Sequence, residues 1–150
     1  PHQFLIVGDG PARGFVETHL PGAVLAGFLK GSDLARAYAS SDAMFNPSST
    51  ETFGNVTLEA MACGLPVVAA AATGSLSLVE EGRSGYFAPI NDAAASAAAL
   101  ARYAQDRALA QAHGAYGHQL AQAYDWDDIN QTVLDRYLML VNGDKATRAA

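Results

Sequence analysis

Short apolar runs and helical stretches alternate along the first part of the chain. The apolar runs have the length of buried strands, and turn residues separate them; they cover residues 4–7, 23–28, 43–45, 67–71 and 86–87. The stretches between them have helical patterns at 13–19, 32–39 and 55–62, with Ser32 as the expected N-cap of the second. Because parallel strands need such crossovers, the alternation predicts an α/β fold, a Rossmann-like parallel sheet with helices on both faces.

The rest of the chain is rich in alanine, which favours helix. We expect helices over 92 to about 123 and over 126–141, and a frayed tail at 142–150. A length of 150 residues, 50% of them hydrophobic, suits one domain with a real core, which we place at 1–141. The chain enters a strand within three residues, so we expect it to be part of a longer protein.

Composition excludes several classes of partner. A net charge of -6 and no basic run argue against nucleic acid or an acidic lipid surface. One cysteine, Cys63, forms no internal disulfide, which favours a reducing compartment. Because no apolar run reaches membrane-spanning length either, we expect a cytoplasmic location from the cysteine usage.

Two carboxylates, Glu51 and Glu59, lie near a predicted helix start, and no lysine or arginine occurs between Arg36 and Arg83. This stretch follows the strand at 43–45, where parallel sheets bind ligands. Gly54 precedes the helix at 55–62, so backbone N–H groups at that helix end form a candidate phosphate site. The helix is apolar nearly all round, which predicts that it is mostly buried and that Glu59 needs a hydrogen-bond partner.

A nucleotide sugar matches this layout, with a diphosphate between sugar hydroxyls and ribose hydroxyls. Carboxylates accept strong hydrogen bonds from such hydroxyl pairs. Other readings stay open at this point: Glu51 as a solvated loop acid, and Glu59 satisfied by backbone or water. The two could also be the acid and base of a glycosidase, which need about 5 to 10 Å between carboxyl groups.

The residues also carry a specific resemblance. The segments Pro47-Ser48, Glu51-Thr52-Phe53-Gly54 and 58–68 closely resemble the donor-site signature of the retaining glycosyltransferases of family four, the group 1 glycosyl transferases. Further matching segments are the turn at 7–11, Gly27 with Phe28, residues 38–42, the turn at 82–86 and Trp126.

The resemblance implies the C-terminal, donor-binding half of a two-domain GT-B enzyme, lacking its first strand and helix and the N-terminal acceptor domain. Such an enzyme transfers a sugar from a UDP-, GDP- or ADP-sugar to a glycan, lipid or small molecule with retention, without metal or other cofactor. The full-length protein could then lie at a membrane surface, and the fragment alone would be inactive. The alternative is a non-catalytic nucleotide-sugar-binding or interaction module of the same fold.

Site residues carried over from the family are assigned by position. Glu51 is the catalytic candidate and binds hydroxyls of the transferred sugar, and Glu59 binds the ribose. The donor sugar and diphosphate contact Glu51, Thr52, Phe53, Gly54, Asn55 and Val56, and the base-side loop is Phe28, Leu29 and Lys30. Two features depart from the family: its Gly-Arg and lysine on the first strand and helix are not in this chain, and 73–76 replaces a Gly-Gly-Pro-like turn, which leaves that loop without an implied role.

Several patterns imitate other sites. The glycines at 8–14 imitate a dinucleotide loop without room for its long helix, and Asp9 there fits a turn role. Asp125 precedes a helix, so capping is expected rather than metal binding. His113 and His118 are five apart and share no helical face, which argues against a metal site. Cys63 is expected at a buried helix end as a packing residue.

Overall fold

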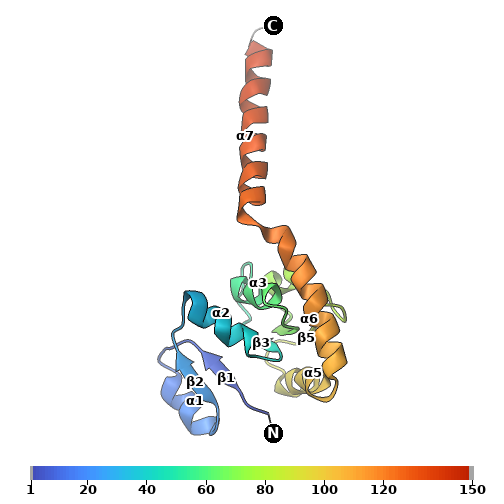
Figure 1. Cartoon of the computed structure of the whole chain (residues 1–150). Helices are drawn as coiled ribbons and strands as arrows, with labels where there is room; N and C mark the ends of the chain where they lie inside the picture. The colour runs from blue at the N-terminus through green and yellow to red at the C-terminus, as the bar shows by residue number, and fades with distance from the viewer. Residues whose placement is uncertain (1, 149–150) are drawn as a thin grey trace.

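The computed structural model describes residues 2–148, with side chains as far as residue 141. Strands and helices alternate as the sequence predicts, and a long helix extends from the body at the C-terminal end (Figure 1). In chain order the elements are β1 (Leu5–Val7), α1 (Arg13–His19), β2 (Val24–Gly27), α2 (Gly31–Ala39), β3 (Met44–Asn46), α3 (Asn55–Ala62), β4 (Val67–Ala70), α4 (Thr73–Leu78), β5 (Gly85–Ala88), α5 (Ala93–Gln105), α6 (Arg107–Ala121), η1 (Gln122–Tyr124) and α7 (Trp126–Arg148).

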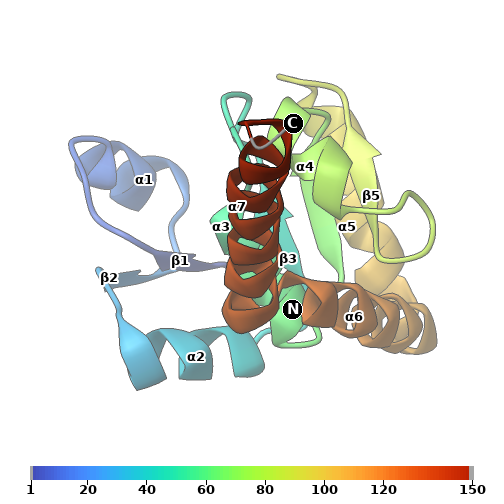
Figure 2. The same ribbon diagram turned by 90° about the horizontal axis from the view of Figure 1, so that it is seen from above.

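All strand pairs are parallel, but they form two sheets instead of the one that the sequence predicts. β1 pairs with β2, while β3, β4 and β5 form a second sheet in which Phe45 lies opposite Val68 and Val68 opposite Tyr86. Within residues 2–148, no strand pairs with both β1 and β3, so each keeps one open edge toward the other sheet. Helices α1 and α2 cover opposite faces of the β1–β2 pair (Figure 2).

The core forms on both faces of β4, whose residues are all buried. Because side chains alternate along a strand, Val67 and Ala69 pack with Met61, Leu78 and Val79 of the segments around α3 and α4. Val68 faces the opposite side and packs with Tyr86 and with Ala99, Tyr103 and Ala110 of α5 and α6. A strand buried on both faces is typical of a parallel sheet covered by helices.

Helix α6 crosses α3 at close range. A Cβ on Gly114 of α6 would collide with the carbonyl oxygen of Gly64, so glycine is required for this approach. His118 of α6 lies 2.7 Å from the Ala62 carbonyl oxygen, one of the unpaired carbonyls at the C-terminal end of α3. These contacts hold the C-terminal end of α3 against α6.

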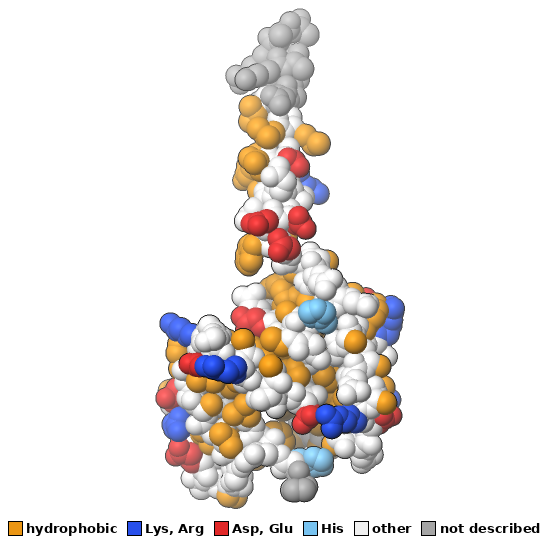
Figure 3. All heavy atoms as spheres, in the orientation of Figure 1, with side chains coloured by type: hydrophobic (Ala, Val, Ile, Leu, Met, Phe, Trp, Pro, Cys, Tyr) orange, Lys and Arg blue, Asp and Glu red, His pale blue; other side chains and the backbone are white. Residues whose placement is uncertain are grey.

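The last helix, α7, runs away from the body and exposes a row of apolar side chains (Figure 3). They include Trp126, Val133, Leu134, Tyr137, Leu138, Met139, Leu140 and Val141. The sequence predicts that this helix ends at residue 141, whereas it continues to Arg148. The tail predicted at 142–150 lies outside the described side chains, and residues 149 and 150 lie outside the described chain. No helix in the described part is long and apolar enough to cross a membrane.

Three local expectations are corrected. The segment predicted as a turn at 73–76 belongs to helix α4. Ser32 is not the N-cap: α2 begins at Gly31, with extended Lys30 in the capping position. Cys63 is exposed rather than buried, since it lies at the outer end of α3, past the residues that face the core.

Candidate functional site

The start of α3 is built around Gly54. This residue is buried, has φ +97° in the left-handed region, and turns the chain from the motif loop into the helix. A Cβ added there would lie 3.2 Å from the Leu78 side chain. Because glycine has no capping side chain, the first N–H groups of α3 are left for another acceptor, and they carry the positive end of the helix dipole. An uncapped helix N-terminus of this kind is able to accept an anion.

The loop before Gly54 packs against the start of α4, which holds it in place. The backbone N–H of Gly74 donates to the Glu51 carbonyl oxygen at 3.0 Å. The two backbones are so close that a Cβ on Gly74 would lie 2.7 Å from the carbonyl carbon of Phe53. The Phe53 ring packs edge-on against Tyr124, with 5.7 Å between ring centroids. The segment at 73–76, which the sequence leaves without a role, thus supports the motif loop.

The Asn46 side chain links β3 to the motif loop and to α3 through hydrogen bonds. It is buried at the carboxyl end of β3, where its Nδ2 donates to Thr57 Oγ1 at 3.1 Å and lies 3.5 Å from Glu51 Oε1. Its Oδ1 accepts a hydrogen bond from the backbone N–H of Ser48 at 3.1 Å. Sequence reasoning missed this residue. Its position in the sequence could have identified it, because a polar residue at the carboxyl end of a buried parallel strand lies at the crevice where such sheets bind ligands.

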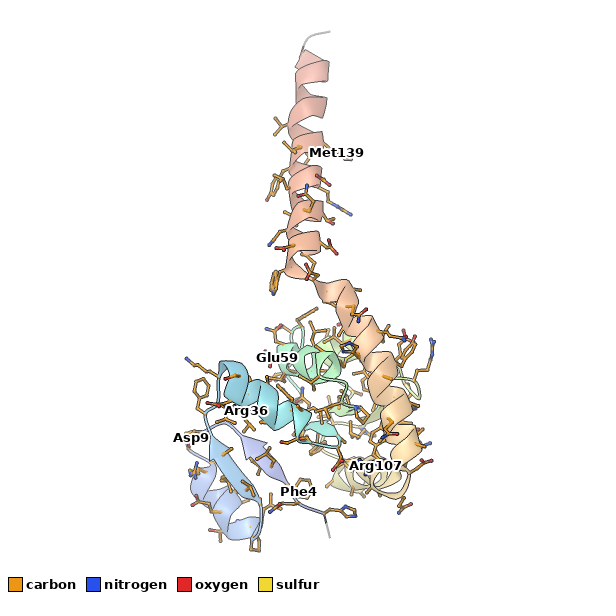
Figure 4. All side chains as sticks on the ribbon, viewed as in Figure 1. Phe4, Asp9, Arg36, Glu59, Arg107 and Met139 are labelled. Atoms are coloured by element: carbon orange, nitrogen blue, oxygen red, sulfur yellow. The ribbon has the colours of Figure 1, made fainter. Side chains whose placement is uncertain are left out.

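Glu59 lies on α3 beside α2 and is exposed (Figure 4). Its Oε2 accepts a hydrogen bond from the Tyr38 hydroxyl of α2 at 3.1 Å. The sequence predicts that Glu59 needs a hydrogen-bond partner but does not identify Tyr38 as that partner. The expectation of a mostly buried α3 is wrong: Thr57, Ala60 and Met61 are buried, but Glu59 and Val56 face solvent. The outer face of α3 stays uncovered within the described chain.

Electrostatics at the site are dominated by acids. Burial, followed by the nearby Glu59 carboxylate, raises the pKa of Tyr38 far above its usual value, so this hydroxyl stays protonated and donates. The same two causes raise the pKa of the Cys63 thiol. Among residues 2–141, neither Glu51 nor Glu59 has an ion-pair partner. Any compensating positive charge other than the dipole of α3 must come with a ligand or from another segment.

The base-side loop Phe28 to Lys30 lies on the first sheet, between β2 and α2. Phe28 is 72% exposed, and the Lys30 Nζ lies 5.1 Å from the centroid of its ring. The loop leads directly into α2, which carries Tyr38 and so contacts Glu59. Glu51 thus lies on the loop before α3 and Glu59 in the middle of that helix, and Tyr38 links Glu59 to α2, which follows the loop at 28–30.

The imitating patterns have structural explanations. Asp125 Oδ1 accepts from the Asp127 backbone N–H at 2.8 Å, which confirms the predicted cap. His113 is buried and lies 2.9 Å from the Tyr103 hydroxyl through its Nδ1. The described residues contain no cluster of three or more histidine, cysteine or acidic side chains suited to a metal ion.

Two hollows of the described surface lie away from the start of α3. One of about 240 Å³ lies between β1 and α1, beside Gly8 to Arg13. The other, of about 390 Å³, lies beside Phe4, between Phe45 of β3 and α5, which contributes Leu100 among others. Neither hollow is lined by Glu51, Gly54 or Glu59.

Comparison with known proteins supports one family. The family model described as "Glycosyl transferases group 1" matches residues 1–106. The GDP-mannose-dependent alpha-mannosyltransferase of Mycolicibacterium smegmatis is 48% identical over 83 residues, which are 55% of this chain and 22% of that protein. The chain spans about a quarter of the length of the curated relatives it matches.

Solved structures agree. Sucrose-phosphate synthase from Thermosynechococcus elongatus matches with a TM-score of 0.84 and 31% identity, over 93% of this chain and 38% of that one. The Anabaena protein HepE, in complex with UDP-glucose, matches with a TM-score of 0.78 and 28% identity, over 89% of this chain and 40% of that one. The family match covers most of the chain, including the whole motif, and the fold agrees with it. This chain therefore belongs to the group 1 glycosyl transferases.

Proposed function

We propose that this chain is the donor-binding part of a retaining glycosyltransferase that uses a nucleotide-diphosphate sugar. The observation that carries the proposal is the uncapped N-terminus of α3, opened by left-handed Gly54 and flanked by Glu51 on one side and Glu59 on the other. Family membership supports it, and so does the similar fold of a protein solved with UDP-glucose.

Each part of the donor then has a place. The diphosphate binds the N–H groups at Gly54 and Asn55, with Thr52, Phe53 and Val56 around it. Glu51, steadied by Asn46, binds hydroxyls of the transferred sugar and is the catalytic candidate. Glu59 accepts from the ribose hydroxyls, and the loop Phe28 to Lys30 lies on the base side. No metal or other cofactor takes part in this proposal.

One helix terminus does not neutralise a diphosphate. It supplies about half a positive charge against roughly two negative ones on the ligand, and stabilising the leaving diphosphate is the main demand of the reaction. The motif has no lysine or arginine between Arg36 and Arg83. We therefore place the missing positive charge on a further strand and helix of the full-length protein.

The open edges of β1 and β3 are the place for that strand. One parallel strand between them would give the order β2-β1-new-β3-β4-β5, which is the 3-2-1-4-5-6 order of dinucleotide-binding sheets. The apolar hollow between Phe4 and Phe45 would be filled by its side chains. The acceptor, which is a glycan, a lipid or a small molecule, binds an N-terminal domain outside this chain, and the full-length enzyme works in the cytoplasm or at its membrane surface.

A non-catalytic module that keeps the nucleotide-sugar site is the second candidate, because the acidic motif could bind a donor without activating it. Calorimetric titration of the full-length protein with UDP-, GDP- and ADP-sugars, followed by an assay for hydrolysis or transfer of the bound donor, separates the possibilities. Binding with turnover supports the enzyme, and binding without turnover on any acceptor supports the module. If none of the donors binds, the donor-site proposal fails.

A further inference from the structure

The hydroxyl of Tyr38 makes the sole described hydrogen bond to Glu59 from elsewhere in the chain. Tyr38 lies on α2, 21 positions before Glu59 in sequence, and donates to its Oε2 at 3.1 Å. The same hydroxyl lies 3.4 Å from the Val56 carbonyl oxygen one turn earlier on α3. A half-buried ring on one helix therefore reaches the polar face of another.

We infer that Tyr38 is a positioning residue of the proposed ribose subsite, where it holds the Glu59 carboxylate ready for the ribose hydroxyls. The inference rests on the proposed function. An exposed glutamate side chain has several rotamers, and without a partner it loses this freedom only when the ligand binds, at a cost in entropy. The Tyr38 side chain has two torsions and is held in the fold, so its hydrogen bond restricts the Glu59 carboxylate before the ligand binds.

The hydrogen bond leaves the carboxylate able to bind a ligand. An ionised carboxylate has about four acceptor positions, and Tyr38 uses one of them on Oε2. Two vicinal ribose hydroxyls need two more. Tyr38 donates its hydrogen bond to Oε2 and leaves the other acceptor positions of the carboxylate free for these hydroxyls.

Tyr38 also connects two parts of the proposed site. Helix α2 begins directly after the base-side loop, with Lys30 in its capping position, and ends just after Tyr38. Tyr38 therefore lies on the helix that joins the proposed base-side loop to the proposed ribose subsite.

The test compares a nucleoside diphosphate with its 2′,3′-dideoxy counterpart, using UDP, GDP or ADP, whichever binds the full-length protein. In the wild type the ribose form binds more tightly. Tyr38→Phe weakens the ribose form about three- to tenfold and the dideoxy form less than about twofold, since one hydrogen bond to a charged group is lost. Adding Tyr38→Phe to Glu59→Gln causes no further loss, because the two residues act together.

Tyr116→Phe is the matched control. Tyr116 also donates to a carboxylate, Glu80 Oε2 at 2.9 Å, but away from the motif, so its removal leaves both affinities unchanged. If Tyr38→Phe leaves the ratio of the two affinities at its wild-type value, whether or not both affinities fall, the inference is overturned while the donor site stands. A wild type that binds both forms equally overturns the ribose role of Glu59 and the inference with it. A wild type that binds neither overturns the proposed function itself.

Discussion

Replacing Gly74 with alanine tests whether α4 positions the motif loop. The new Cβ would lie 2.7 Å from the Phe53 carbonyl carbon and 2.9 Å from its nitrogen and oxygen, all backbone atoms. Comfortable carbon contacts are about 3.5–4.0 Å, so the loop must move by close to 1 Å. Overpacking of this kind costs about 1–3 kcal/mol, against a gain of up to about 1 kcal/mol from alanine in a helix. We expect a net loss of about 1–2 kcal/mol in the free energy of unfolding.

The same shift displaces Glu51, whose carbonyl oxygen accepts from the Gly74 N–H. Donor affinity should fall about five- to tenfold, the equivalent of one lost hydrogen bond. Urea unfolding and calorimetry with the best-binding donor measure the two effects. Gly14→Ala is the matched control, because Gly14 lies in helix α1 with nothing within 4 Å of its added Cβ, and it should gain about 0.5–1 kcal/mol instead. Gly74→Ala with wild-type stability and affinity would refute the reasoning.

Three further predictions follow from the same geometry. Glu59→Gln should weaken donor binding by about 1–3 kcal/mol and leave urea unfolding unchanged, because the side chain is exposed; the opposite pattern would assign it a structural role. Burial and then the Arg102 charge hold the pKa of His113 below 6.5, so the unfolded chain binds its proton more readily. Stability should therefore be full above about pH 6.5 and fall as the pH drops below it, and His113→Gln should flatten that dependence in urea titrations at pH 7.5 and 5.0. The isolated chain should show no turnover beside the full-length enzyme with the same donor, since the remaining charge, the acceptor and domain closure lie outside it; equal turnover would contradict this.

Local signals predicted much of the fold. The bounds of α3 agree with the sequence prediction, because Gly54 and Gly64 mark both of its ends. The strands were placed within two residues, since each is a short apolar run between turns. The N-cap at Asp125 was also predictable from its own neighbours.

Features that depend on distant contacts were not predictable. The bond between Tyr38 and Glu59 joins two helices that only the fold brings together. The short helix α4 lacks a strong apolar period, and its role depends on the backbone of Phe53 lying against Gly74. Glu59 and Cys63 are exposed because the outer face of α3 stays uncovered within the described chain. The apolar sequence of the helix does not show which of its faces is covered.

The central claim is that α3 receives the diphosphate of a nucleotide sugar. A crystal structure of the full-length protein with its best-binding donor tests it most directly. The account predicts diphosphate oxygens within hydrogen-bond distance of the N–H groups of Gly54 and Asn55, with the ribose hydroxyls on Glu59. A donor bound elsewhere, for example in the hollow beside Gly8 to Arg13 and with the start of α3 unoccupied, would contradict it.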